Sequence, residues 1–85
     1  MDREKDIMLL NAADERGLLP VLFANLVSSE ALLSEDACLK AIELLTGFKE
    51  AIPETQIGDK EYWLGMADGG IEVAKRDLER YRNNG

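Results

Sequence analysis

Side chains that could carry chemistry are few in this chain, and none of them is a histidine. Without histidine the commonest general base is missing, and Ser–His and Cys–His nucleophile pairs are excluded. The acidic doublets Asp14–Glu15 and Glu35–Asp36 are the nearest approach to paired carboxylates. Adjacent residues on a helix point in different directions, so neither doublet converges on one substrate atom. The sequence therefore predicts that the protein is not an enzyme.

Ligand sets for metals and cofactors are also missing. Cys38 is the only cysteine, so the usual four Cys or His ligands of zinc cannot be assembled, and no intramolecular disulfide can form. No run of alternating oxygen ligands predicts a calcium loop. The glycines of Gly65–Gly70 lack the spacing and the preceding strand of a phosphate-binding loop. We expect no cofactor, no metal and no small-molecule substrate, and we expect Cys38 to be a buried thiol.

The charge balance disfavours nucleic acid as a direct partner. The 85 residues include 10 Lys or Arg and 17 Asp or Glu, a net charge of −7. Phosphate contacts supply most of the affinity for nucleic acid, and an acidic protein offers few of them. The start of the chain has mixed charge, and the longest apolar run is too short for a bilayer, which takes about 20 residues. We expect a single cytoplasmic domain that does not contact the membrane.

The elements that would position any site are helical. Patterns typical of helices cover about residues 2–16, 18–33, 34–52 and 59–82. Asp2 and Ser34 are suited to cap the first and third segments, and Gly17 and Pro53 to end them. Asp59 is suited to cap the last segment.

The second segment contains the most apolar run, Leu18–Val27, in which only Asn25 is polar. Its length and composition favour a buried helix, although the β-branched residues leave a strand as the alternative. The helix either continues to Leu33 or breaks near Ser28. We predict an all-α fold: a small bundle of three to four helices in which amphipathic helices cover this central hydrophobic helix.

The last two segments supply the clearest amphipathic faces. Apolar residues recur at helical spacing in both segments: Cys38, Ala41, Ile42, Leu45, Phe48 and Ile52 in the third, and Trp63, Ala67, Gly70, Ile71, Ala74, Leu78 and Tyr81 in the fourth. The fourth is predicted to be a long C-terminal helix. Gly69 and Gly70 inside it each cost about 1 kcal/mol relative to alanine, so they predict a kink or a close backbone approach. Gly65 and Gly69 are one turn apart and would permit tight helix contact.

An excess of apolar surface without catalytic groups favours a protein-binding function. The chain would be an adaptor, a small secretion or assembly chaperone, or a subunit of a complex, bound to a protein partner or to itself. Aromatic side chains are common interface anchors. Six residues are the candidate partner contacts: Phe23, Leu26, Tyr62, Trp63, Met66 and Gly69. A single Trp in a small domain usually belongs to the core, so the core is the favoured place for Trp63 and an interface is the alternative.

The alternative function is that of an acidic inhibitor, of the kind carried by phages and mobile elements. Such a protein occupies a basic, nucleic-acid-binding surface of its target. The polar stripe of the third segment contains Asp36, Glu43 and Glu50, which are the candidate residues. Binding of this kind weakens as salt rises.

Overall fold

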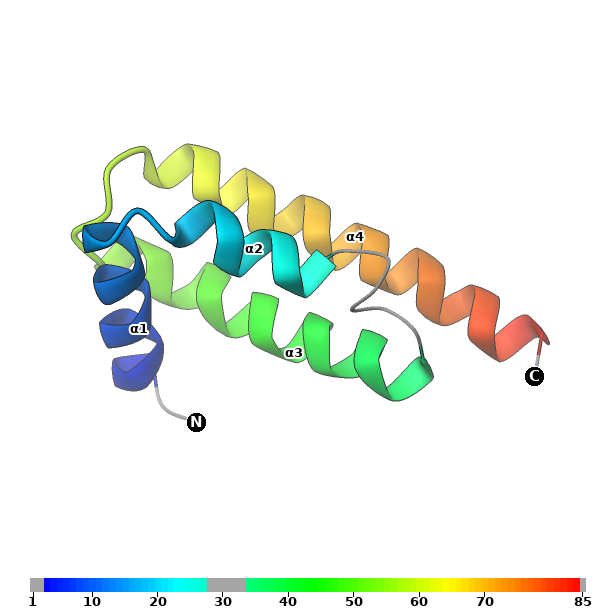
Figure 1. The fold of residues 1–85 in the computed structure, drawn as a ribbon. Coiled ribbons are helices and arrows are strands. Elements are labelled where there is room, and N and C mark those ends of the chain that lie inside the picture. Colours follow the sequence, from blue (N-terminus) through cyan, green and yellow to red (C-terminus); the bar gives the residue numbers. More distant parts are fainter. Residues whose placement is uncertain (1–2, 28–33, 85) are drawn as a thin grey trace.

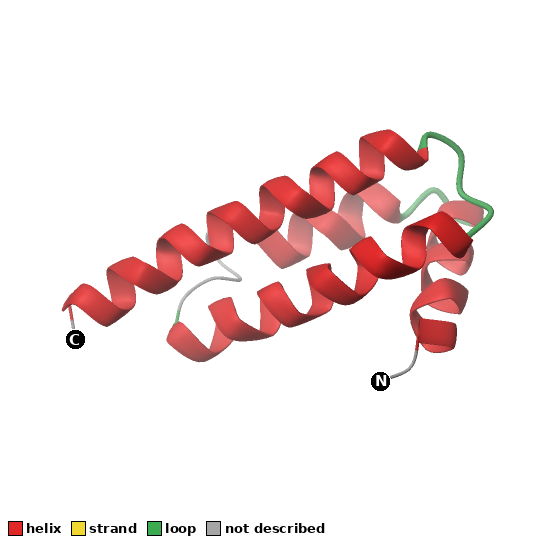
Figure 2. Cartoon of the chain, turned by 180° about the vertical axis from the view of Figure 1, so that it is seen from behind, coloured by secondary structure: helices red, strands yellow, loops and turns green. Residues whose placement is uncertain are grey.

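The fold is entirely helical in the described part of the chain, residues 3–27 and 34–84 of a computed structural model (Figures 1 and 2). Its elements are α1 (Arg3–Glu15), α2 (Leu19–Val27), α3 (Glu35–Ala51), a 3-10 turn η1 (Ile52–Glu54) and α4 (Lys60–Asn84). The prediction of an all-α bundle with a long C-terminal helix is confirmed. The predicted cap at Asp2 and the question of a break near Ser28 lie outside the described residues.

The antiparallel pair of α3 and α4 forms the long axis of the molecule, whose extents are 42 × 23 × 18 Å (Figure 1). Small side chains let these two helices pack closely, and Cys38, Ala41, Ala67 and Ala74 are all buried. The helix α2 lies along this pair, and α1 crosses it near the connection between α3 and α4 (Figures 1 and 2). The pair therefore forms the framework on which the two N-terminal helices are mounted.

Local signals set the ends of α3. Ser34 caps its start, because the side-chain oxygen accepts a hydrogen bond from the Ala37 N–H at 3.1 Å. At the other end, the helical conformation does not stop abruptly at Pro53. The chain tightens into η1, where the Thr55 hydroxyl donates to the Ile52 carbonyl at 2.7 Å. This turn leads into the loop before α4, in which Ile57 is buried.

The placement of α2 corrects the prediction of a central, covered helix. Among the residues of α2 whose burial is described, 19–26, Leu19 and Phe23 are buried, whereas Leu18 just before the helix and Val21 within it are half exposed. The most buried helix is α3, which contributes five buried residues to the core. A nine-residue helix lying on a pair of longer helices buries one side, and in the described part of the chain no element covers the other side of α2.

The structure of α4 also differs from one of the predictions made for its glycines. The helix runs without interruption through Gly69 and Gly70. Gly70 is buried, but Gly65 and Gly69 are exposed, and a Cβ built on either would meet nothing within 4 Å. Within the described chain, therefore, no tight helix contact forms at Gly65 and Gly69.

Candidate functional site

The Cys, Asp and Glu side chains of the described residues do not assemble into a metal site. No group of three His, Cys, Asp or Glu in this part of the chain could hold a metal ion. Glu35 binds Arg82 across the α3–α4 pair at 3.0 Å, and both Glu35 and its neighbour Asp36 are exposed. The doublet therefore splits as helix geometry predicts.

Cys38 is buried, as expected, among Ala41, Ala74 and Leu78. Burial raises the pKa of its thiol above the ordinary value, and the nearby Asp77 carboxylate raises it further. Both effects disfavour the thiolate, which is the nucleophilic form. The thiol therefore contributes to packing and is held in its less nucleophilic, protonated form.

The turn at Gly17 builds the most prominent apolar feature of the surface. Gly17 has a φ of 69°, a conformation that glycine adopts with least strain. The Leu18 N–H donates to the Ala13 carbonyl at 2.8 Å, and the Gly17 N–H donates to the Asp14 carbonyl at 3.0 Å. These two bonds form a Schellman motif, which ends α1 and turns the chain sharply into α2. Because of this turn, one side of α1 and one side of α2 line the same groove.

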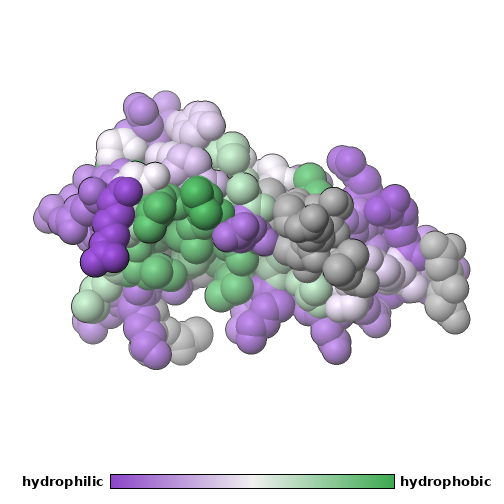
Figure 3. Space-filling view, viewed as in Figure 1, coloured by the Kyte–Doolittle hydropathy of each residue, from purple (hydrophilic) through white to green (hydrophobic). Residues whose placement is uncertain are grey.

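This α1–α2 groove has a volume of about 490 Å³. Its walls are Leu9, Ala12, Ala13 and Arg16 from α1 and the turn after it, and Leu18, Val21, Leu22 and Asn25 from α2 and the residue just before it. The side chains of Leu9, Leu18 and Val21 are 47%, 46% and 53% exposed. Figure 3 shows a continuous hydrophobic area over α2 on this face of the molecule. Among the described residues that line the groove, Arg16 is the only charged one.

Two of the predicted contact residues in α2 face inward. Phe23 is 1% exposed and packs against the rings of Phe48 and Trp63, with centroid distances of 6.0 and 5.2 Å. Leu26 is half-buried against the same core. The exposed side of α2 carries Val21 and Asn25 instead. Asn25 is the sequence signal for that side, because Leu18, Val21 and Asn25 follow at helical spacing.

The predicted contact residues of α4 divide between core and surface. Trp63 is half-buried, and its ring meets Phe23 on one side and the edge of Tyr62 at a centroid distance of 4.9 Å. Tyr62, Met66 and Gly69 are exposed and spaced at i, i+4 and i+7, so they form one stripe along the outside of α4. We call this the α4 outer stripe.

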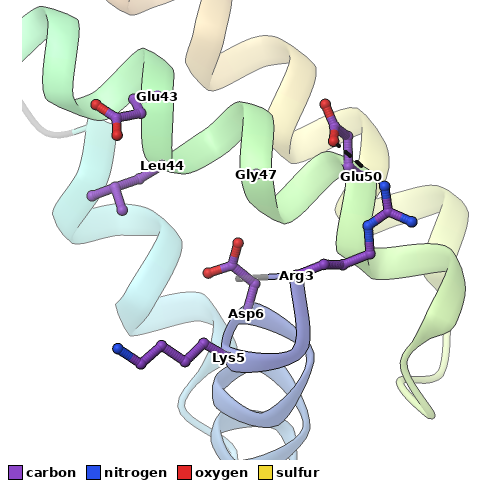
Figure 4. A pocket seen from close by; sticks show the side chains of 7 residues that line it. All are labelled: Arg3, Lys5, Asp6, Glu43, Leu44, Gly47 and Glu50. Atoms are coloured by element: carbon purple, nitrogen blue, oxygen red, sulfur yellow. Dashed lines mark ion pairs between the residues drawn. The ribbon is translucent and has the colours of Figure 1, made fainter. Parts of the chain in front are cut away.

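A second concavity lies where α1 crosses α3 (Figure 4). The α1–α3 cleft has a volume of about 500 Å³ and is lined by Arg3, Lys5, Asp6, Glu43, Leu44, Gly47 and Glu50. Arg3 binds Glu54 at 2.9 Å and approaches Glu50 at 3.9 Å. A Cβ added to Gly47 would lie 2.8 Å from the Asp6 Oδ2 atom. The cleft is thus a charged helix crossing, made close by a glycine that the sequence analysis did not single out.

The acidic candidates occupy an exposed stripe of α3. Asp36, Glu43 and Glu50 are seven residues apart, so they fall on nearly the same side of the helix, and all three are exposed. Glu50 is engaged by Arg3, and Lys40 interrupts the stripe between the first two acids. The structure therefore places these carboxylates together, with cations beside them.

No protein-family model, curated protein or solved structure matches the chain. None of the helices in residues 3–27 and 34–84 is long and apolar enough to cross a membrane. The shape and the exposed apolar side chains of the α1–α2 groove make it the candidate site.

Proposed function

We propose that the protein is a non-enzymatic binding module that takes an apolar segment of a protein partner into the α1–α2 groove. An adaptor, an assembly or secretion chaperone, and a subunit of a larger complex would all work in this way. The observation that carries the proposal is the half-exposure of Leu9, Leu18 and Val21 around one concavity. The lack of histidine and the buried Cys38 support a role without catalysis, and a lone thiol suits the cytoplasm.

The size of the groove limits the affinity that it provides alone. Burying the exposed half of each of these three side chains contributes about 1 kcal/mol, roughly 3 kcal/mol in all. A micromolar complex needs about 8 kcal/mol, and association has its own entropic cost. A partner must therefore also contact the rim of the groove. Met8, on the neighbouring side of α1, is 71% exposed and extends the apolar surface.

The test compares Val21→Asp with Leu39→Asp, a change on the surface of α3 outside the groove, where Leu39 is 43% exposed. Both variants should keep the helical circular-dichroism spectrum of the wild type. Chemical crosslinking in the cell of origin, followed by mass spectrometry, should recover a specific partner with the wild type and Leu39→Asp, but not with Val21→Asp. The proposal would be contradicted if the wild-type chain were monomeric by light scattering, bound no hydrophobic dye and formed no crosslink through the groove.

The acidic inhibitor is the second candidate, supported by the exposed stripe of Asp36, Glu43 and Glu50. It requires a basic partner whose binding weakens steeply as salt rises. Replacing the three residues together by Asn, Gln and Gln should abolish that binding while Val21→Asp leaves it intact. The opposite pattern would assign function to the groove.

A further inference from the structure

Helix α1 contributes little to the hydrophobic core. Of its 13 residues only Leu10 and Ala13 are buried, and Ile7 packs partly against the same core. By comparison, α3 contributes five buried residues, and α2 packs Phe23 against two aromatic rings. The apolar attachment of α1 therefore depends mainly on one leucine.

The polar contacts that hold α1 are exposed to water. Arg3 binds Glu54 at 2.9 Å and approaches Glu50 at 3.9 Å, and each of these side chains is about half exposed or more. The Gln56 N–H donates to the Asn11 Oδ1 atom at 2.9 Å, also in an exposed place. Such contacts contribute little to stability, because water replaces them at small cost. A helix of 13 residues is itself only marginally stable alone.

The turn at Gly17 supplies a hinge between α1 and α2. Gly17 is exposed, and an added Cβ there would meet no atom within 4 Å. Glycine changes between left-handed and right-handed backbone conformations at little cost. On the other side of the turn the chain is fixed by Leu19 and Phe23, which are both buried. Rotation at the turn can therefore lift α1 while α2 stays in place.

We propose that α1 is a hinged strap, which leaves α3 as one unit by rotation about Gly17 while α2, α3 and α4 stay folded. Local openings are drawn from segments with few buried apolar contacts and exposed hydrogen bonds, and α1 has both properties. In the closed form α1 packs against the C-terminal end of α3 and against η1 (Figure 1). Ala51 and Ile52 are fully buried there, so opening exposes apolar surface at this end of the molecule.

The strap also regulates the groove, a consequence that rests on the proposed function. Leu9, Ala12 and Ala13 form the α1 wall of the groove, so the groove exists only while the strap is closed. A partner in the groove binds the closed form alone and therefore holds α1 on α3. The opening itself is a property of the chain without a partner, and it can be tested separately.

Native-state hydrogen exchange of the wild-type chain, measured at increasing urea concentrations, tests the strap. Amides in the body of α1 should have protection factors at least about tenfold lower than those in the middle of α2 and α4. Their exchange should also depend less on urea, because opening exposes less surface than unfolding does. One shared opening for all helices would overturn the proposal. An opening shared by α1 and α2 alone would place the hinge after α2 and would also overturn it.

A matched pair of single-cysteine variants provides the second measurement. Leu10→Cys and Leu45→Cys, each in a Cys38→Ala background, make the same change at positions in α1 and α3 that are both 0% exposed. A thiol reagent should modify Leu10→Cys at least about tenfold faster than Leu45→Cys in buffer, and both equally fast in urea. Equal rates in buffer would contradict the strap and leave the groove untouched as a binding site.

Discussion

Val21 and Phe23 are two residues apart in α2 and have opposite surroundings. Phe23 lies inside an aromatic cluster with Phe48 and Trp63, whereas more than half of the Val21 side chain is exposed. Two residues correspond to about 200° around a helix, so both side chains cannot face the core. Composition alone hides this difference, because nearly every residue of the run is apolar.

Phe23→Ala should lower the free energy of unfolding by about 3–5 kcal/mol, since it removes a buried ring and leaves a cavity. In a domain of this size that loss is a large part of the total stability. Val21→Ala should cost less than about 1 kcal/mol, because only part of its surface is buried. Urea denaturation followed by circular dichroism measures both. Equal losses would show that the exposed side of α2 has been assigned wrongly.

Cys38 gives stability a dependence on pH. Its pKa is raised in the folded state by burial and by Asp77, so the folded protein keeps the thiol proton to higher pH than the unfolded chain does. The associated stability is fully present below the unfolded-state pKa of about 8.5 and is lost as pH rises through the folded-state value.

The urea midpoint of the wild type should therefore fall from about pH 8.5 upward by more than that of Cys38→Ala, which has no thiol to titrate. Modification by a thiol reagent should be slow in buffer and fast in urea. A native-state reaction as fast as that of the unfolded chain would show that the thiol is not protected.

At the scale of elements, the α3–α4 pair forms the framework of the fold, whereas the turn at Gly17 sets the shape of the groove. The pair is held by buried contacts, because its exposed ion pairs, such as Lys49–Asp68, contribute little in water. The turn sets the angle between α1 and α2 and thereby creates the groove. It depends on one residue with a φ of 69° and on two hydrogen bonds.

Gly17→Ala should lower the free energy of unfolding by about 1–2 kcal/mol, because an L side chain is strained in the left-handed conformation. No other atom lies within 4 Å of the added Cβ, so a loss would reflect backbone strain and not a clash. Gly58→Ala is the matched control, since Gly58 has open space and no positive φ. It should be neutral or slightly stabilising. Equal effects at the two positions would argue against the Schellman turn.

At the scale of the whole molecule, net charge opposes compaction. A charge of −7 on 85 residues makes the folded state repel itself, and the exposed ion pairs offset little of that repulsion. Salt screens the repulsion at long range. The elongated shape keeps the two ends of the α3–α4 pair far apart, so the repulsion is strongest between neighbouring acids such as those along α3.

Added NaCl should therefore raise the thermal midpoint, and the triple variant Asp36→Asn/Glu43→Gln/Glu50→Gln should show a smaller rise. Thermal melts followed by circular dichroism at several NaCl concentrations provide the comparison. A midpoint that falls with salt would mean that attractive pairs, such as Arg3 with Glu54, outweigh the net repulsion.

The sequence by itself determined the helices, and it excluded chemistry that needs a histidine or a pair of cysteines. Helical periodicity, the Ser34 cap and the Gly17 end depend on residues within one or two turns, so they can be read without a fold. The sequence also indicates which side of α2 is exposed, because its polar residue Asn25 lies on that side.

Only the tertiary structure decided which apolar side chains remain exposed. The groove depends on the angle between α1 and α2, and the burial of Phe23 depends on rings from α3 and α4 that are distant in the chain. The close approach of Asp6 to Gly47 likewise joins two helices. Burial depends on how segments pack together and cannot be derived from any one of them. For that reason the candidate contact residues are Leu9, Leu18 and Val21, whereas the sequence pointed to Phe23 and Leu26.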